Sequence, residues 1–396
     1  MDRLFRKDGM ISVFLILVLA SMIGAMLMFV GAAINQAEQV LCKEYIHLAG
    51  RSLLSEYHIP LKERYNLFAT DLNLHQQEST MTFYLTENFR KQYTLSLNLD
   101  SLKMSLHEFS LGNIDVLEHQ ILEATTYPPS HNIKETTGAF RPLPLETTGW
   151  GILPSKGHSG YSLNLTQLKE YFRGEATNPL NGSALFRLRY IQKYFNHNKR
   201  TTFIPNSHFQ NEAEYLLYGL PSDDENLRRF QRDFTALRTL LNLAHIKSDP
   251  QKMKTLSVAA SILTPGPKAV VTQLALAGIW AGFEANNDWK LLVNGEGVEP
   301  MKGEEHWALS FDAISKNREA GNYVSPKKES SVGYEKYLNG FLLLQNRETQ
   351  LLRILDLIQI NLCCITKSHF LVQECYTGFS YEITINGVDY VGTEIY

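Results

Sequence analysis

The four cysteines carry the most reactive side chains of this chain, and three of them lie near the C-terminus. Cys363 and Cys364 are adjacent and Cys375 follows them, whereas Cys42 lies close to the N-terminus. In an oxidising compartment, Cys375 could form a disulfide with Cys363 or Cys364 if the segments that carry them pack together. The alternative is that the thiols are free and buried. A zinc site is not favoured, because the sequence holds no C-x-x-C pair.

A run of three acidic residues, Asp223, Asp224 and Glu225, could supply carboxylate oxygens to Ca²⁺ or Mg²⁺. The run directly follows Pro221 and Ser222, and the spacing S-x-x-E is typical of the capping box that starts a helix. Acidic side chains in a first turn are also stabilised by the helix dipole. Since a helix start explains the run, the sequence predicts no metal there.

The sequence lacks the motifs of several common enzyme classes. It has no G-x-x-x-x-G-K-[ST], no G-x-G-x-x-G at the start of a helix and no H-E-x-x-H. The 12 histidines are scattered and form no pair with ligand spacing on an evident helix. We therefore expect no catalytic residue, no cofactor and no metal, and a protein that is not an enzyme.

Charge and composition exclude further classes. The chain has 38 Lys and Arg against 41 Asp and Glu, a net charge of -3, which gives no basic surface for nucleic acid. Hydrophobic residues make up 44% and charged residues 20%, as in a folded protein. A mean hydropathy of -0.19 excludes a membrane protein with many spans.

The N-terminal segment must position the rest of the chain, and no charged residue occurs from Gly9 to Ala37. Its apolar centre, Ile11 to Ile34, has 24 residues. As a helix it would be about 36 Å long, more than the roughly 30 Å of a bilayer's hydrocarbon core. The apolar region of a secretory signal has only about 7–15 residues, so an uncleaved span is favoured. The small residues at 30–32 would nevertheless suit a signal-peptidase site.

We expect a transmembrane helix over 10–34, with the lipid bilayer as its partner. Arg3, Arg6 and Lys7 precede it, and basic residues next to a span stay in the cytoplasm. Residues 1–9 are therefore predicted to be cytoplasmic, and residues 35–396 to be extracytoplasmic.

Two pairs of small residues lie within the predicted span. They are Ala20 with Gly24 and Ser21 with Ala25. Small residues four apart let two membrane helices approach closely, so the pairs predict lateral association. The alternative is that small residues are common in any membrane helix and make no specific contact here.

Helical patterns dominate the predicted extracytoplasmic region. The membrane helix should continue over 34–57, because that stretch has no Pro, only one Gly, and roughly one apolar face. Apolar residues at spacings of three and four predict a helical block over 222–362. Its most apolar run, Val270 to Phe283, suits a buried core helix better than a second span.

Strand patterns occur on either side of this block, so the predicted fold class is α+β. Over 368–396, Asn386-Gly387 separates two alternating runs and predicts a hairpin with a type I′ turn. Phe370 to Tyr376 is expected to add a third strand, which gives an antiparallel C-terminal β-meander. The stretch 80–110 also has a β-prone composition, and Asn294 to Gly297 is a second candidate hairpin.

Several strings resemble, in order and along nearly the full chain, a family of uncharacterised Firmicutes proteins that carries a domain-of-unknown-function label. The most specific is NEAEYLLYGLPSDDENL at 211–227, which resembles the family element E-x-E-Y-x-x-x-G-x-x-S-D-x-x-N-L. The others are GMISVFLILVL at 9–19, LLSEYHIPLKERYNLFA at 53–69, DVLEHQILEA at 115–124, and YEKYLNGFLLL with RETQLLRILDLIQINL at 334–362.

The resemblance implies an envelope component. Genes of the family are often found in loci similar to tight-adherence (Tad/Flp) pilus and type II-like secretion systems, which implies a layout similar to that of minor pseudopilins. Prepilins are cut after a Gly, so processing after Gly9 would make Met10 the first mature residue. The fifth mature residue would then be Phe14 where pilins usually have Glu, so the packing that depends on this Glu does not carry over.

We therefore expect a non-enzymatic, single-pass, membrane-anchored envelope protein. It would be a minor pseudopilin-like or assembly component of a Tad/Flp-type pilus or secretion apparatus, and would contact other envelope proteins through its span and its body. The alternative is a membrane-anchored extracytoplasmic module that binds an unknown ligand. A polar-lined pocket of ligand size would favour that alternative.

Overall fold

The protein was analysed as a computed structural model, and its residues form two compact units. Unit 1 comprises residues 1–58, 69–110 and 376–396, and unit 2 comprises residues 59–68 and 111–375. Most of unit 2 is therefore inserted in the sequence between two segments of unit 1. The residues described are 4–91, 96–127, 135–145, 147–158, 164–174, 182–315, 323–366 and 369–396.

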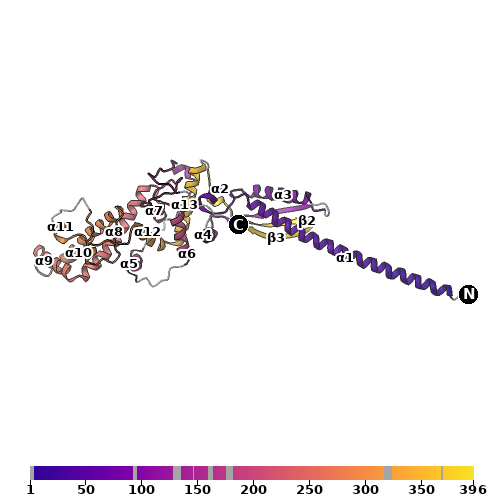
Figure 1. The fold of residues 1–396 in the computed structure, drawn as a ribbon, viewed down its shortest axis with the longest axis horizontal. Coiled ribbons are helices and arrows are strands. Elements are labelled where there is room, and N and C mark those ends of the chain that lie inside the picture. Colours follow the sequence, from indigo (N-terminus) through magenta and orange to yellow (C-terminus); the bar gives the residue numbers. More distant parts are fainter. Residues whose placement is uncertain are drawn as a thin grey trace. The chain divides into compact units, whose positions relative to one another are not determined.

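Unit 1 combines a long helix with a small antiparallel sheet (Figure 1). The sheet has three strands in the order β1-β2-β3. Its core joins one face of α1 to α3 and to the sheet. The fold class is thus α+β, as predicted. The elements are α1 (Leu4–Leu54), α3 (Leu74–Arg90), β1 (Leu99–Ser105), η1 (His107–Phe109), β2 (Gly378–Ile385) and β3 (Val388–Ile395).

The C-terminal hairpin is confirmed, but its third strand comes from elsewhere. Asn386 and Gly387 both have positive φ, 49° and 75°, as a type I′ turn requires. The third strand is β1, which pairs antiparallel with β2. The expected strand at Phe370–Tyr376 was wrong, because Val372–Glu374 forms the 3-10 turn η4 instead. In the expected strand Phe370, Val372 and Cys375 are buried, so the alternation of a strand stops after Val372.

The β-prone stretch 80–110 was only partly predicted correctly, because α3 occupies its first third. Asn73 and Gln76 form a capping box that starts this helix. Met81, Leu85 and Phe89 then place one residue per turn in the core. This period of four outweighs the β propensity of the Thr, Phe and Tyr residues between them.

Unit 2 is mainly helical. Its longest helices, α8 and α10, pack against each other, and α9 packs against both. The predicted helical block over 222–362 is seen as α8 to α13. The elements are α2 (Ile59–Tyr65), α4 (Ile114–Thr126), η2 (Thr147–Trp150), α5 (Leu165–Arg173), α6 (Gly182–Tyr194), α7 (Glu212–Tyr218), α8 (Asp223–Ser248), α9 (Pro250–Leu263), α10 (Ala269–Val293), η3 (Glu304–His306), α11 (Phe311–Ser315), α12 (Tyr334–Leu343), α13 (Arg347–Thr366) and η4 (Val372–Glu374).

Two of the described helices are long and apolar enough to cross a membrane, but they differ in burial. In α13, 89% of the apolar window is buried inside the protein. This helix is therefore the core helix of unit 2, and every residue from Thr349 to Cys364 is buried. In α1, none of the apolar window, within Ile11–Leu54, is buried.

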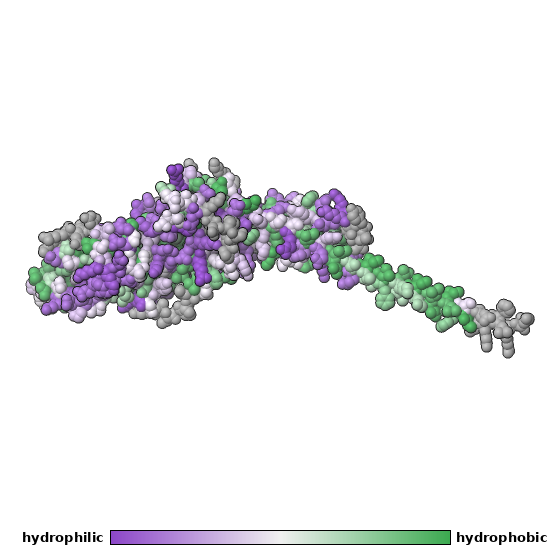
Figure 2. All heavy atoms as spheres, viewed as in Figure 1, coloured by the Kyte–Doolittle hydropathy of each residue, from purple (hydrophilic) through white to green (hydrophobic). Residues whose placement is uncertain are grey.

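The run Val270 to Phe283, which lies in α10, was expected to be a buried core helix, and the structure shows that only one face of this run is buried. Ala277, Trp280 and Ala281 are buried against neighbouring elements. On the outer face, Val271 is 71% exposed. With the end of α9, this face forms an apolar patch, which is green in Figure 2. The exposed members of the patch are Val258, Ile262, Leu263, Val270, Val271, Leu274, Ile279 and Phe283.

The second candidate hairpin, at Asn294–Gly297, was also wrong. The helix α10 continues to Val293, and Asn294 then donates its backbone N–H to the carbonyls of Lys290 and Leu291. Gly295 follows with φ 85°, so the Asn-Gly pair ends a helix here. The same dipeptide therefore serves as a hairpin turn in unit 1 and as a helix end in unit 2.

Candidate functional site

The apolar half of α1 is the largest bare apolar surface of unit 1. From Ile11 to Val30, its large apolar side chains are 38–78% exposed. No charged residue interrupts this half (Figure 2). Exposed apolar surface on this scale is removed from water by lipid or by another protein. The helix is long and apolar enough to span a membrane, as predicted.

The second half of α1 is held firmly in unit 1. Cys42, Ile46 and Ala49 lie one turn apart and are fully buried against α3 and the sheet. His47 Nδ1 lies 2.9 Å from Glu394 Oε1 on β3. The Asn386 amide of the hairpin turn donates to Glu38. The helix is thus fixed to the sheet from Glu38 onward, as the predicted continuation over 34–57 requires.

The small residues of the predicted packing motif lie on the bare half of α1. Ala20, Ser21, Gly24 and Ala25 are all exposed. The Ser21 hydroxyl donates to the Val18 carbonyl, one turn earlier, so it does not need a partner from outside the helix. A Cβ added at Gly24 would meet nothing within 4 Å. Their contact with another membrane helix stays a prediction.

The proposed processing site lies inside a continuous helix. Gly9 and Met10 fall in the first turns of α1, which begins at Leu4. No break separates them from the apolar segment that follows. Cleavage after Gly9 stays a prediction, which the mature N-terminus would test.

The predicted disulfide is not formed in the structure. Cys42, Cys363, Cys364 and Cys375 are all buried, and none of them is in a disulfide. The Cys363 thiol donates to the Phe370 carbonyl at 3.5 Å, and the Cys375 thiol to the Leu371 carbonyl at 3.8 Å. Burial raises the pKa of Cys363 and Cys364, so both are poor thiolates. The alternative of buried thiols describes these residues.

The acidic run at 223–225 forms the first turn of α8, as predicted, but the predicted hydrogen bond of the capping box is not made. Ser222 is the N-cap residue and its side chain makes no capping hydrogen bond. Instead, the Asp223 carboxylate accepts from the backbone N–H groups of Gln210 and Asn211, at 3.1 and 2.8 Å. The described residues include no group of three His, Cys, Asp or Glu side chains that could hold a metal ion.

A buried ionic network in unit 2 was not predicted. Arg238 on α8 lies 2.9 Å from Asp288 on α10, and both side chains are fully buried. Lys302 contacts Asp288 at 2.5 Å and also Glu284. Glu284 accepts from the backbone N–H groups of Ala308 and Leu309 as well. With two cations, two carboxylates and these donors, the network is neutral and closed, so we interpret it as structural.

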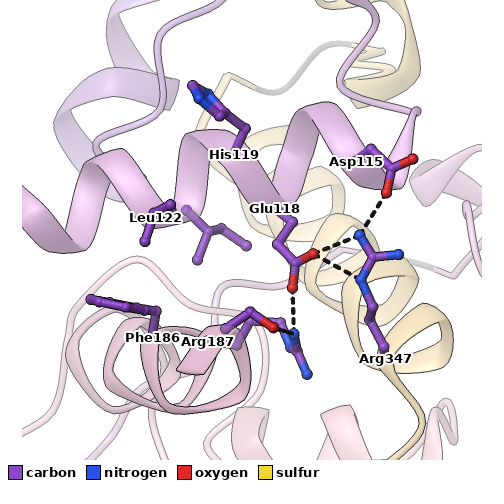
Figure 3. Close-up of a pocket in the computed structure, with 9 residues that line it drawn as sticks. Asp115, Glu118, His119, Leu122, Phe186, Arg187 and Arg347 are labelled. Carbon is purple, nitrogen blue, oxygen red and sulfur yellow. Dashed lines mark hydrogen bonds and ion pairs between the residues drawn. The ribbon is translucent and has the colours of Figure 1, made fainter. Parts of the chain in front are cut away.

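A cavity of about 260 Å³ in unit 2 lies beside a second ionic cluster (Figure 3). Glu118 on α4 points toward both Arg187 on α6 and Arg347 on α13, and Asp115 also contacts Arg347. Burial tends to raise the pKa of Glu118, but hydrogen bonds from Arg347 and Arg187 outweigh it and lower the pKa. Since each cation of the cluster faces a carboxylate, the cluster fastens three helices together and leaves no free charge for a ligand.

A second cavity of unit 2, of about 460 Å³, lies beside Arg353 of α13. We call it the Arg353 cavity. Basic, hydroxyl and aromatic side chains line it, and the described lining residues include no carboxylate. This mixture of polar and aromatic side chains fits the polar-lined pocket that the ligand-binding alternative calls for. Its lining includes Trp150, Ser155, Lys156, His158, Tyr215, Tyr218, Gly219 and Arg353.

A signal for these missed residues was present in the sequence. Glu284 and Asp288 lie four apart, directly after the apolar run that ends at Phe283, and Arg353 and Asp356 interrupt the apolar run of α13. Charged residues are rarely buried unless they are paired, so charges within an apolar helix mark contacts across the core. The sequence does not reveal which distant residues they meet.

Comparison with known proteins identifies a family and nothing beyond it. A family profile matches residues 152–387, more than half of the chain, and is described as a family of unknown function (DUF5702). No curated protein matches the chain. No solved structure matches it either.

Proposed function

The chain belongs to the DUF5702 family, whose function is unknown, and from this premise we propose that it is a non-enzymatic, single-pass, membrane-anchored envelope protein. In this proposal it acts as a minor pseudopilin-like or assembly component of a Tad/Flp-type pilus or secretion apparatus. It uses the bare half of α1 in the bilayer and presents residues 35–396 outside the cytoplasm.

The division of α1 into two halves is the observation that carries the proposal. Its first half is apolar and exposed, and one face of its second half is buried against α3 and an antiparallel sheet. A helix of this kind couples a membrane-embedded segment rigidly to a folded body. The same layout is what the resemblance to minor pseudopilins implies, and that resemblance is the support for the pilus or secretion apparatus.

Two further features support a cytoplasmic N-terminus and a non-enzymatic role. Arg3, Arg6 and Lys7 precede the apolar segment, which favours a cytoplasmic N-terminus. The two ionic clusters described above, around Asp288 and Glu118, are neutralised internally. Groups neutralised in this way stabilise a fold and are poor general acids or bases.

The mature N-terminus of the membrane-extracted protein tests the proposal first. Intact mass and N-terminal peptide analysis would find Met10 as the first residue if a prepilin-type peptidase acts after Gly9, which supports a fibre subunit. An intact Met1 supports a permanent anchor and hence an assembly role. An end near Ala33 would show that the segment is a cleaved signal, and the membrane-anchor proposal would be withdrawn.

Crosslinking tests the proposed partners. A photoreactive residue at Gly24 or Ser21 should crosslink to another envelope protein in intact cells. The same probe at Met26, on the opposite face of the same helix, is the matched control and should crosslink less. A soluble, monomeric protein with no crosslink from any of these positions would contradict the proposal.

A further inference from the structure

Arg353 of α13 is a buried cation that forms no ion pair with any carboxylate of the described residues. The residue is only 4% exposed, and no described carboxylate lies within ion-pair distance of it. Its Nη1 donates to the carbonyl of Leu216, at 3.1 Å, and to that of Leu217. These carbonyls belong to the last turn of α7, so Nη1 caps that helix. Nε and Nη2 donate to no described residue.

Gly219 leaves the Nε–Nη2 edge of the Arg353 guanidinium uncovered. It follows α7 directly and has φ 65°, in the left-handed region that favours glycine. A Cβ at Gly219 would lie 2.8 Å from Arg353 Nε, 3.3 Å from Cζ and 3.5 Å from Nη2. Both residues line the Arg353 cavity. The missing side chain therefore keeps the Nε–Nη2 edge open beside the cavity.

The acid one turn further along α13, Asp356, forms no ion pair with Arg353 and makes its hydrogen bonds elsewhere. Asp356 Oδ1 accepts from the Ser155 backbone N–H at 2.9 Å, and Oδ2 accepts from the Tyr215 hydroxyl at 3.1 Å. Asp356 thus holds two walls of the cavity in place. Burial lowers the pKa of Arg353, and the opposite effect of the nearby Asp356 charge does not outweigh it.

Other residues of the lining add hydrogen-bond donors and the flat faces of aromatic rings. Lys156 is exposed at the lining and has no ion pair with any described residue. His158 Nε2 lies 3.6 Å from Glu348, which is outside the lining. Trp150 and Tyr215 contribute buried aromatic rings. A volume of about 460 Å³ falls in the range of small-molecule sites, about 300–1,000 Å³.

We propose that the Arg353 cavity binds a small organic anion, a carboxylate or phosphate monoester with an aromatic or apolar body. The Nε–Nη2 edge of Arg353 pairs with two oxygens of the anion, the geometry for which a guanidinium is suited. Lys156 adds positive charge, and the rings of Trp150 and Tyr215 contact the body of the ligand. This inference goes beyond the membrane role proposed above and does not depend on it.

Calorimetric titration of the full-length protein in detergent tests the inference. Benzoate and phenyl phosphate are the anionic probes, and benzyl alcohol is the uncharged control. We expect at least one anion to bind about tenfold or more tightly than benzyl alcohol. The tighter of the two anions distinguishes a carboxylate from a phosphate ligand.

Two variants tie binding to the cavity. Arg353→Lys keeps the charge but loses the paired donors, and should weaken anion binding about tenfold. Lys156→Glu, at an exposed side chain that makes no ion pair with a described residue, should weaken it about fivefold. Lys254→Glu, on exposed α9 outside the cavity, makes the same charge change and should leave binding unchanged.

Either of two results would overturn the inference. The first is that neither anion binds more tightly than benzyl alcohol. The second is that Lys156→Glu binds the anions as Lys254→Glu does. Since Lys156 is exposed, its variant keeps the test decisive even if Arg353→Lys disturbs the end of α7.

Discussion

Arg238 and Asp288 lie 2.9 Å apart with neither side chain exposed to solvent, and they join the two longest helices of unit 2, α8 and α10. The guanidinium also donates to the Pro300 carbonyl and to Asn242. Asp288 receives Lys302 on its other oxygen. The pair is therefore the centre of a network in which each charge is matched, and removal of one member leaves a buried charge unmatched.

Asp288→Asn should lower the free energy of unfolding of unit 2 by about 3–5 kcal/mol, the cost of breaking a buried ion pair. Asp115→Asn is the matched control, because Asp115 pairs with Arg347 but its side chain is 77% exposed. That change should cost no more than about 1 kcal/mol. All four tryptophans lie in unit 2, so urea unfolding followed by their fluorescence reports on this unit alone. Equal losses in the two variants would show that the buried network is not a stabilising centre.

The C-terminal hairpin could be predicted from the sequence, whereas the Arg238–Asp288 network could not. Asn386-Gly387 was sufficient to predict the hairpin, because a type I′ turn depends on the two residues themselves. The Arg238–Asp288 pair spans 50 positions in the sequence, and it forms only because α8 packs on α10. Local patterns indicated that charges lay in apolar helices but not which of them meet.

The same reasoning explains the partial success at the candidate sites. The bare half of α1 was predicted because its length and uniform apolarity are properties of one segment. The Arg353 cavity was missed, because its lining comes from the loop around Trp150, the end of α7 and the middle of α13. Whether Cys375 could form a disulfide depended on its distance in space from Cys363 and Cys364, which spacing in the sequence does not give.

Glu214 makes the stability of unit 2 depend on pH. It is fully buried and accepts from the Tyr334 hydroxyl and the Asn198 backbone N–H, while Oε2 has no partner among the described residues. Burial raises its pKa to about 7. Since the folded pKa lies above the ordinary value of 4.5, the native state holds a proton that the unfolded state has lost. The contribution of Glu214 to the free energy of unfolding is fully present below about pH 4.5 and is lost as the pH rises through about 7.

Glu214→Gln, which stays neutral at every pH, should remove this dependence. At pH 8 the variant should be more stable than the natural protein by about 2–3 kcal/mol, and near pH 4.5 the two should be alike. His197, whose pKa burial lowers to about 4, titrates in both proteins and cancels in the difference. The measurement is urea unfolding by tryptophan fluorescence from pH 4.5 to 8. A difference that does not change with pH would rule out a titrating Glu214.

Ile46 should be a main attachment of α1 to unit 1. It is 1% exposed, and Ile46→Ala should lower the free energy of unfolding of unit 1 by about 2–4 kcal/mol through the cavity it leaves. Leu48→Ala, two residues along the same helix at a site 51% exposed, should change it by less than about 0.5 kcal/mol. Cys42 is the cysteine of unit 1, so its alkylation rate in urea, read by mass spectrometry, reports on this unit. If both variants protect Cys42 equally, the buried face of α1 does not hold the helix to the sheet.

A substitution by Lys should destabilise unit 2 on the buried face of α10 but not on its exposed face. Ala281 is fully buried, and Ala281→Lys would force a long charged chain into the core at a cost above about 2 kcal/mol. Val271 is 71% exposed, and Val271→Lys should leave the free energy of unfolding within about 0.5 kcal/mol of its natural value. Tryptophan fluorescence in urea measures both, because Trp280 lies on the buried face of the same helix. A large loss for Val271→Lys would mean that the outer face of α10 is covered in the folded protein, contrary to the exposure of its valines, leucine and phenylalanine.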